Sequence, residues 1–260
     1  MRNFFIGVIA ILAGHLVLAP VMLAQNQETG RKKEQPATSN EPFNPHDLTA
    51  VWRFHGTQTL SRNMPPMTPW GQQAFDAAKP GLGPRGAPLG NDPMMSCDPM
   101  GIPRILFYFA VPEEIIQLPD RVVQLFDWYH TFRVIWTDGR ELPKDPDPRW
   151  IGYSVGKWEG DVFVVQSNGF NDRTWVDFFG APHSDAMHVE ERYHRVDHDT
   201  IELNITIDDP KAYTKPWVSE TKTLKLTAPK EFTEDFCVPS DEERYKELMR
   251  LPAVGVDPKK

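Results

Sequence analysis

A hydropathy period of two dominates the chain from residue 105 to residue 226. Its clearest stretch alternates Ile201, Leu203, Ile205 and Ile207 with polar residues. Successive side chains of a strand point to opposite faces, so this pattern indicates strands with one buried and one solvated face. The fold class is therefore mainly β.

The alternation and the turn residues between segments predict a series of short strands. Because no helical crossover separates them, we expect an antiparallel meander of about eight or nine strands that closes into a barrel, with a β-sandwich as the alternative. From Ile105 onward the expected strands are Ile105–Ala110, Glu113–Leu118, Val122–Trp128, Phe132–Trp136, Trp150–Gly156, Asp161–Ser167, His188–Arg195, Thr200–Ile207 and Trp217–Leu226, and Asp47–Trp52 is expected as a separate short strand before them.

Two short helices are expected outside the strands. Residues 64–103 are rich in proline and glycine, which excludes long regular elements, but Thr68 followed by Pro69 predicts a helix through Ala78. Near the end of the chain, a capping box that begins at Ser240 predicts a helix through about Arg250, before Pro252. Residues 46–260 are expected to form a single domain.

The amino-terminal segment predicts the compartment. Residues 1–24 combine one basic residue with a long apolar run, as a secretory signal peptide does, and an uncleaved membrane anchor is the alternative. Residues 25–45 are polar and predict a flexible linker. We therefore expect a periplasmic or secreted protein with no transmembrane domain once the signal is cleaved.

Charge and cysteine content narrow the partners and the redox state. Lys and Arg total 28 against 36 Asp and Glu, for a net charge of −8, so nucleic acid is not an expected partner. The two cysteines, Cys97 and Cys237, are most simply explained as one disulfide in an oxidising compartment.

Four motifs carry a resemblance over roughly residues 47–239. They are Asp138–Pro143 (DGRELP), Gly152–Asp161 (GYSVGKWEGD), Glu190–Asp197 (EERYHRVD) and Asp208–Pro210 (DDP). Together they resemble a family of uncharacterised exported bacterial proteins, which implies export and a β fold but no activity.

The segment Leu48–Arg53 is similar to the Gly-x-Trp opening of lipocalin-like barrels, in which the tryptophan plugs one end. Here Ala50 stands in place of the glycine, and Trp52 is the matching tryptophan. The resemblance implies a lipocalin-like barrel.

One aromatic-rich strand suggests an interior binding site. If the strand runs straight, Trp128, His130, Phe132 and Trp136 share its inward face, and His130 is the only titratable group among them. Burial would keep His130 neutral and available as a base. A satisfied histidine or a bend at Tyr129 is the alternative interpretation.

Glu191 lies between Val189 and Tyr193 in the alternation, so it is expected to point inward. A buried carboxylate needs a partner, and Arg133 or Arg195 is available. With His130 or Asp127, Glu191 would form an acid and base couple.

The Gly-x-Ser-x-Gly sequence around Ser154 is followed by a turn and a strand rather than a helix. A nucleophile elbow requires the helix, so Ser154 is not expected to be a nucleophile.

These patterns lead to one leading hypothesis, an exported barrel that binds a small, largely apolar or aromatic molecule. The alternatives are a cofactor-free lyase or isomerase that uses His130, Glu191 and Asp127, and a structural partner of another envelope protein. The sequence predicts no cofactor and no metal. The side chains expected to contact the ligand are Trp128, Phe132, Arg133, Trp136, Tyr153 and Tyr193.

Overall fold

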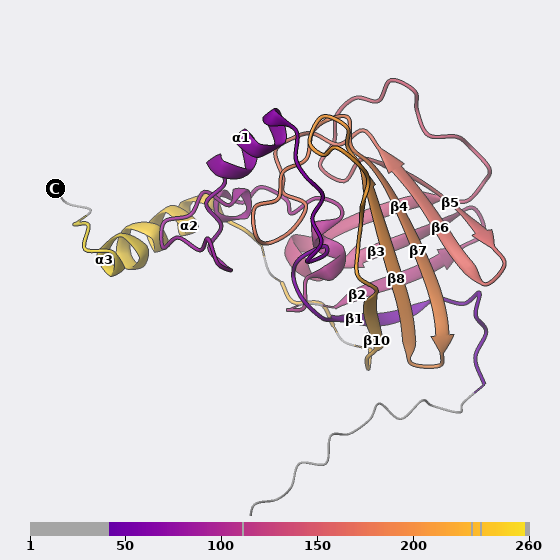
Figure 1. Ribbon diagram of the computed structural model, residues 1–260. Coiled ribbons are helices and arrows are strands. Elements are labelled where there is room, and N and C mark those ends of the chain that lie inside the picture. The colour runs from indigo at the N-terminus through magenta and orange to yellow at the C-terminus, as the bar shows by residue number, and fades with distance from the viewer. Residues whose placement is uncertain (1–41, 111, 230, 235, 258–260) are drawn as a thin grey trace, which may run out of the picture. The chain divides into compact units, whose positions relative to one another are not determined.

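A computed structural model describes residues 42–257 apart from residues 111, 230 and 235. The expected signal peptide at 1–24 and the linker as far as residue 41 lie outside the described residues. Figure 1 shows the strands wrapping around a common interior. Within the described residues, one hydrophobic cluster includes side chains from both the strands and the proline-rich loop.

Nine strands close into a barrel, which confirms the barrel prediction over the sandwich. The ring closes because β10 pairs with both β1 and β8, while β9 extends the edge of β8. The strands are β1 Ala50–His55, β2 Glu113–Leu118, β3 Arg121–Phe126, β4 Thr131–Trp136, β5 Tyr153–Glu159, β6 Val162–Asn168, β7 His188–Asp197, β8 Thr200–Asp208, β9 Trp217–Val218 and β10 Lys222–Leu226.

The alternation in β8 has the predicted consequence. Ile201, Leu203, Ile205 and Ile207 are fully buried, and Glu202 between them is exposed. Strand β8 pairs along its length with β7, where a bulge between Arg195 and Asp197 shifts the register. The longest antiparallel pair therefore presents its apolar residues to the barrel core.

The prediction of a wholly antiparallel meander is wrong at one pair. Strands β4 and β5 are parallel, and their register has a single pair, Trp136 with Val155. Residues 137–152 carry the chain back between them, so that β5 starts in the same direction as β4 and not as the next arm of a hairpin. The barrel wall consequently has little backbone pairing at this seam.

Two expected strands take another form. The residues predicted as the strand Ile105–Ala110 start instead within a 3-10 helix, η2 Arg104–Phe107, and all four side chains of this helix are buried. The expected strand Trp217–Leu226 is broken into β9 and β10 at Ser219, whose hydroxyl accepts a hydrogen bond from the backbone N–H of Ile205 (2.8 Å).

The predicted early helix is confirmed as α1 Pro69–Ala77. The Thr68 hydroxyl caps it by accepting from the backbone N–H of Gly71 (3.1 Å). Gly71 packs directly against the backbone of Ala212, where an added Cβ would lie 2.1 Å from the Ala212 carbonyl oxygen. The helix is thus docked on the barrel through its glycine.

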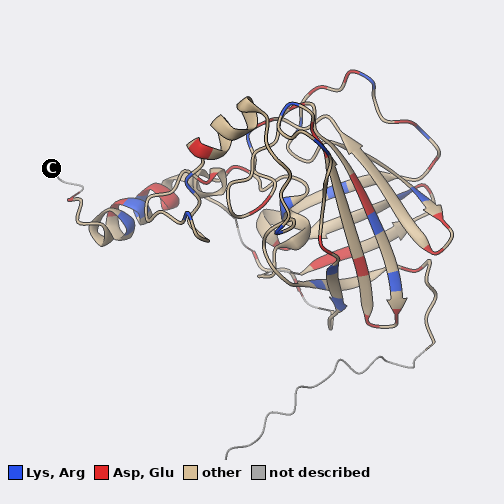
Figure 2. Ribbon diagram, in the orientation of Figure 1, with Lys and Arg blue, Asp and Glu red and all other residues tan. Residues whose placement is uncertain are grey.

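The carboxyl-terminal helix exists, but its expected ends are wrong. It comprises α2 Pro239–Tyr245, a π-helical turn η4 Lys246–Arg250 and α3 Leu251–Ala253. Val238 occupies the cap position without a side-chain hydrogen bond, so the capping box at Ser240 does not form. Figure 2 shows acidic and basic residues close together along this helix, consistent with the ion pair between Lys246 and Glu243 (3.2 Å).

The expected disulfide joins Cys97 and Cys237, whose Cα atoms are 5.4 Å apart. Cys97 follows the short helix η1 Pro93–Ser96, so the bond ties the proline-rich loop to the segment before α2. Disulfides of this kind are typical of oxidising compartments. Among the described residues, no helix is both long and apolar enough to cross a bilayer.

Candidate functional site

Arg133, on β4, is the centre of a polar network inside the barrel. Its guanidinium has five N–H groups, and each has an acceptor. Two go to the carboxylate of Glu191 on β7 (2.7 and 2.8 Å), and the others go to Ser154, Ser167 and Gln124 (3.0, 2.7 and 3.1 Å). Glu191 therefore has the inward orientation and the arginine partner that its position predicted.

A second carboxylate, Glu113 on β2, borders this network. The Gln124 amide donates to Glu113 (3.2 Å) and to the Tyr193 hydroxyl (3.1 Å), and that hydroxyl donates to Glu191 (2.8 Å). Burial and the nearby Glu191 charge raise the pKa of Glu113 to about 8, although Arg133 opposes the shift. At neutral pH, Glu113 is therefore protonated and the network holds one carboxylate charge against one guanidinium.

The interior beside this network is filled. The space bounded by Gln124, Tyr193 and their apolar neighbours has no room for a water molecule. Those neighbours are Leu48, Ile115, Val122, Ile135 and Phe163. A ligand at this point would have to displace side chains, which is costly in a close-packed core.

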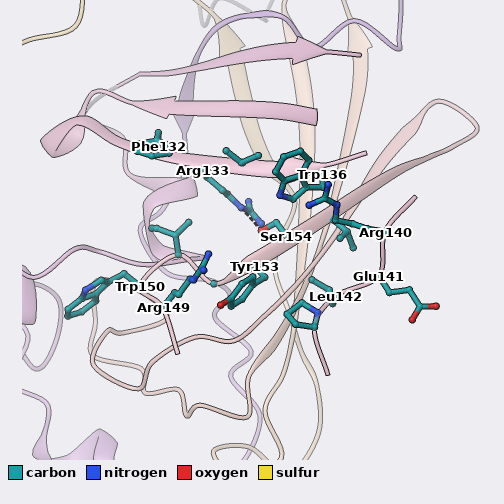
Figure 3. Close-up of a pocket in the computed structure, with 15 residues that line it drawn as sticks. Phe132, Arg133, Trp136, Arg140, Glu141, Leu142, Arg149, Trp150, Tyr153 and Ser154 are labelled. Carbon is teal, nitrogen blue, oxygen red and sulfur yellow. Dashed lines mark hydrogen bonds between the residues drawn. The ribbon is translucent and has the colours of Figure 1, made fainter. Parts of the chain in front are cut away.

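An open cleft lies instead at the β4–β5 seam (Figure 3). It has a volume of about 560 Å³, and we call it the seam pocket. It forms where the parallel strands share only one register pair and the connection 137–152 wraps across them. Its lining comprises Phe132, Arg133, Val134, Trp136, Arg140, Glu141, Leu142, Pro143, Arg149, Trp150, Ile151, Gly152, Tyr153, Ser154 and Val155.

Aromatic rings and guanidinium groups form the walls of the seam pocket. Arg140 lies over the ring of Trp136 (3.7 Å to the ring centre), and Arg149 lies over the ring of Tyr153 (4.0 Å). Cation–π attraction favours these placements of each guanidinium over its ring. Arg133 and Ser154 form the floor, since the hydrogen bond between them closes the wall where backbone pairing stops.

Four of the six side chains expected to contact a ligand line this pocket: Phe132, Arg133, Trp136 and Tyr153. The other two lie elsewhere. Tyr193 is in the filled interior, and Trp128 packs against Tyr108 and Tyr129 with ring centres 5.0 and 4.2 Å apart.

His130 does not face the barrel interior, because the strand bends at Tyr129, as the alternative interpretation of the sequence allowed. Tyr129 and His130 both have positive φ (49° and 51°), and this kink shifts the alternation by one residue. As a result Phe132 is exposed, Arg133 is buried, and His130 lies at the surface with its ring 4.4 Å from that of Phe236.

The predicted acid and base couple is not assembled around Glu191. Asp127 is buried but accepts hydrogen bonds from the backbone and hydroxyl of Thr233 (2.6 and 3.0 Å). His130 is exposed, whereas Glu191 is fully buried and occupied by Arg133. The catalytic roles suggested for these three residues gain no support from this geometry.

Sequence reasoning missed Glu113 and Gln124 as interior polar residues. A signal was present, because Gln124 lies between Val122 and Phe126 in the alternation and therefore belongs to the buried face. Ser154 and Arg149 as pocket residues had no comparable local signal, since the seam that brings them together is a feature of strand order.

Comparison with known proteins does not identify the chain. No protein-family model, no curated protein and no solved structure matches it. The resemblance to exported bacterial proteins and to lipocalin-like barrels therefore stays a prediction, while the closed nine-stranded barrel is a property of this structure.

Proposed function

We propose that the protein binds a small, largely apolar molecule, and that the binding site is the seam pocket. The observation that carries the proposal is a cleft of about 560 Å³ walled by aromatic side chains, whereas the barrel interior around Gln124 and Tyr193 has no room for a ligand. Pockets for small organic ligands have this size and combine apolar walls with a few polar groups. The exposed Phe132, with 64% of its surface accessible, also becomes understandable as part of such a site.

We also propose that binding takes place outside the cytoplasm, in the periplasm or after secretion. The disulfide between Cys97 and Cys237 supports this placement, since such bonds persist mainly in oxidising compartments. The apolar amino-terminal segment 1–24 supports it from the sequence.

A neutral fluorescent probe tests the site directly. N-phenyl-1-naphthylamine gains emission in apolar surroundings, and we expect the protein to saturate with it. Val134→Trp adds a bulky ring to the pocket lining and should abolish the signal, whereas Val218→Trp, at an exposed position on β9, should leave it unchanged. Binding that survives Val134→Trp, or no binding by the wild-type protein, would refute the proposal.

A further inference from the structure

The seam pocket carries one positive charge that no carboxylate balances. Three of its lining residues are arginines. Arg133 is paired with Glu191, and Arg140 with Asp138 (2.5 Å between Nη2 and Oδ2). Within the described residues, the Arg149 guanidinium has no carboxylate partner, and it is placed by its contact with the ring of Tyr153.

The surroundings do not cancel this charge. Glu141, the only carboxylate in the described lining, extends away from Arg149 and Tyr153 in Figure 3. Behind the pocket floor, the charge of Glu191 is matched by Arg133. Burial raises the pKa of Glu113 to about 8, so this second interior carboxyl is neutral at pH 7.

The pocket floor also has a spare hydrogen-bond donor. The hydroxyls of Ser154 and Ser167 each accept from Arg133, and their oxygens are 3.0 Å apart, so one hydroxyl donates to the other. Two hydroxyl protons are present and this contact uses one. No other described residue accepts the second proton. Either hydroxyl can be the donor in this contact, and donation from Ser167 to Ser154 leaves the free proton on Ser154, which lines the pocket.

We infer that the ligand of the seam pocket is the monovalent anion of a carboxylic acid with an aromatic or branched aliphatic body. Arg149 supplies the positive charge, the Ser154 hydroxyl donates to a carboxylate oxygen, and the body packs between Trp136 and Tyr153. One unbalanced guanidinium matches one negative charge, which favours a carboxylate over a phosphate dianion. This inference rests on the proposed function and specifies its ligand class.

Isothermal titration with three naphthalene compounds of one shape tests the inference. The probes are 2-naphthoate, its methyl ester and the cation 2-naphthylmethylammonium. We expect the carboxylate to bind about tenfold more tightly than the ester, and the cation to bind most weakly. Raising the salt concentration should weaken binding of the carboxylate and leave that of the ester nearly unchanged.

Arg149→Leu should reduce the affinity for 2-naphthoate to that for the ester, and leave the ester affinity unchanged. Arg62→Leu makes the same change of net charge at an exposed position outside the pocket and should alter neither. Ser154→Ala should lower the affinity for the carboxylate several-fold and that for the ester less, because the neutral ester carbonyl is the weaker acceptor. Because Ser154 also accepts from Arg133, circular dichroism must first show that this variant is folded, and Arg149→Leu decides the question if it is not.

The outcomes separate the two proposals. Equal binding of carboxylate and ester, or tighter binding of the cation, would overturn the inference and leave the proposed function standing. Binding of none of the three compounds, together with failure of the neutral probe, would overturn the proposed function itself.

Discussion

Glu113 should make the stability of the barrel fall as the pH rises. Its pKa is about 8 in the folded protein, against a usual value of 4.5, chiefly because it is buried. Below pH 4.5 the carboxyl is protonated in both the folded and the unfolded state, so its ionisation does not change the free energy of unfolding. Between pH 4.5 and 8 only the unfolded chain releases the proton, so folding loses about 1.4 kcal/mol per pH unit. Between pH 5.5 and 7.5 the loss from this one group is about 2.5 kcal/mol.

Glu113→Gln replaces the titratable carboxyl with a neutral amide. The side chain keeps its size and an oxygen that can accept the hydrogen bond from Gln124. Urea unfolding followed by tryptophan fluorescence, with the disulfide intact, gives the free energy of unfolding at pH 5.5, 6.5 and 7.5. We expect the variant to gain about 2.5 kcal/mol relative to the wild-type protein across that window. Other buried groups with shifted pKa values, Asp177 and His183, affect both proteins and cancel in the comparison.

Glu114→Gln removes a carboxylate from the neighbouring, less buried position of β2 and controls for the change of net charge. If the unfolding free energies of the wild-type protein and Glu113→Gln differ by the same amount at all three pH values, the reasoning is refuted. Such a constant difference would come from packing and not from the buried carboxyl.

Three other changes probe what holds the structure together. Replacing Cys97 and Cys237 together by Ala opens a loop of 140 residues and should cost about 4 to 5 kcal/mol of unfolding free energy. Arg133→Met leaves Glu191 buried without its partner and should cost about 3 to 5 kcal/mol, more than the double variant in which Glu191 is also replaced by Leu. Gly71→Ala places a methyl group 2.1 Å from a backbone oxygen and should cost about 1 to 3 kcal/mol, measured as a lower thermal midpoint.

Each of these predictions has a matched comparison. Dithiothreitol should lower the stability of the wild-type protein to that of the double cysteine variant and leave the variant unchanged. A double variant at 133 and 191 that is no more stable than Arg133→Met would contradict the buried-charge argument. Gly81→Ala serves beside Gly71→Ala, because an added Cβ at Gly81 meets no atom within 4 Å, and equal effects at both glycines would exclude the packing explanation.

The strands were predictable because alternation and turns are local properties. Strand β2, Glu113–Leu118, has the predicted bounds, and β4 to β8 differ from prediction by a few residues at most. The inward position of Glu191 followed from the same alternation, and its need for a partner followed from the cost of burying a charge. With only two cysteines in the chain, the disulfide pairing had one solution.

The candidate site was predictable only as a set of residues. Phe132, Trp136 and Tyr153 were expected to face a ligand inside the barrel, and they line a pocket in its outer wall. The error comes from the kink at Tyr129 and His130, where a shift of one residue exchanges the inward and outward faces of β4. Hydropathy favoured the wrong face of the strand, because the buried positions of β4 are Arg133 and Ile135, whereas the alternate positions carry the more apolar Phe132, Val134 and Trp136.

By itself, the sequence determined the β class, most strand positions, the cysteine pairing and the burial of Glu191, since each depends on residues close together in the chain or on a single available partner. Tertiary structure alone decided the parallel seam between β4 and β5, the filled interior and the placement of Arg149 and Ser154 in one pocket. These features depend on how segments far apart in the chain order themselves around a closed ring, and strand order leaves no periodic trace in the residues of any one strand.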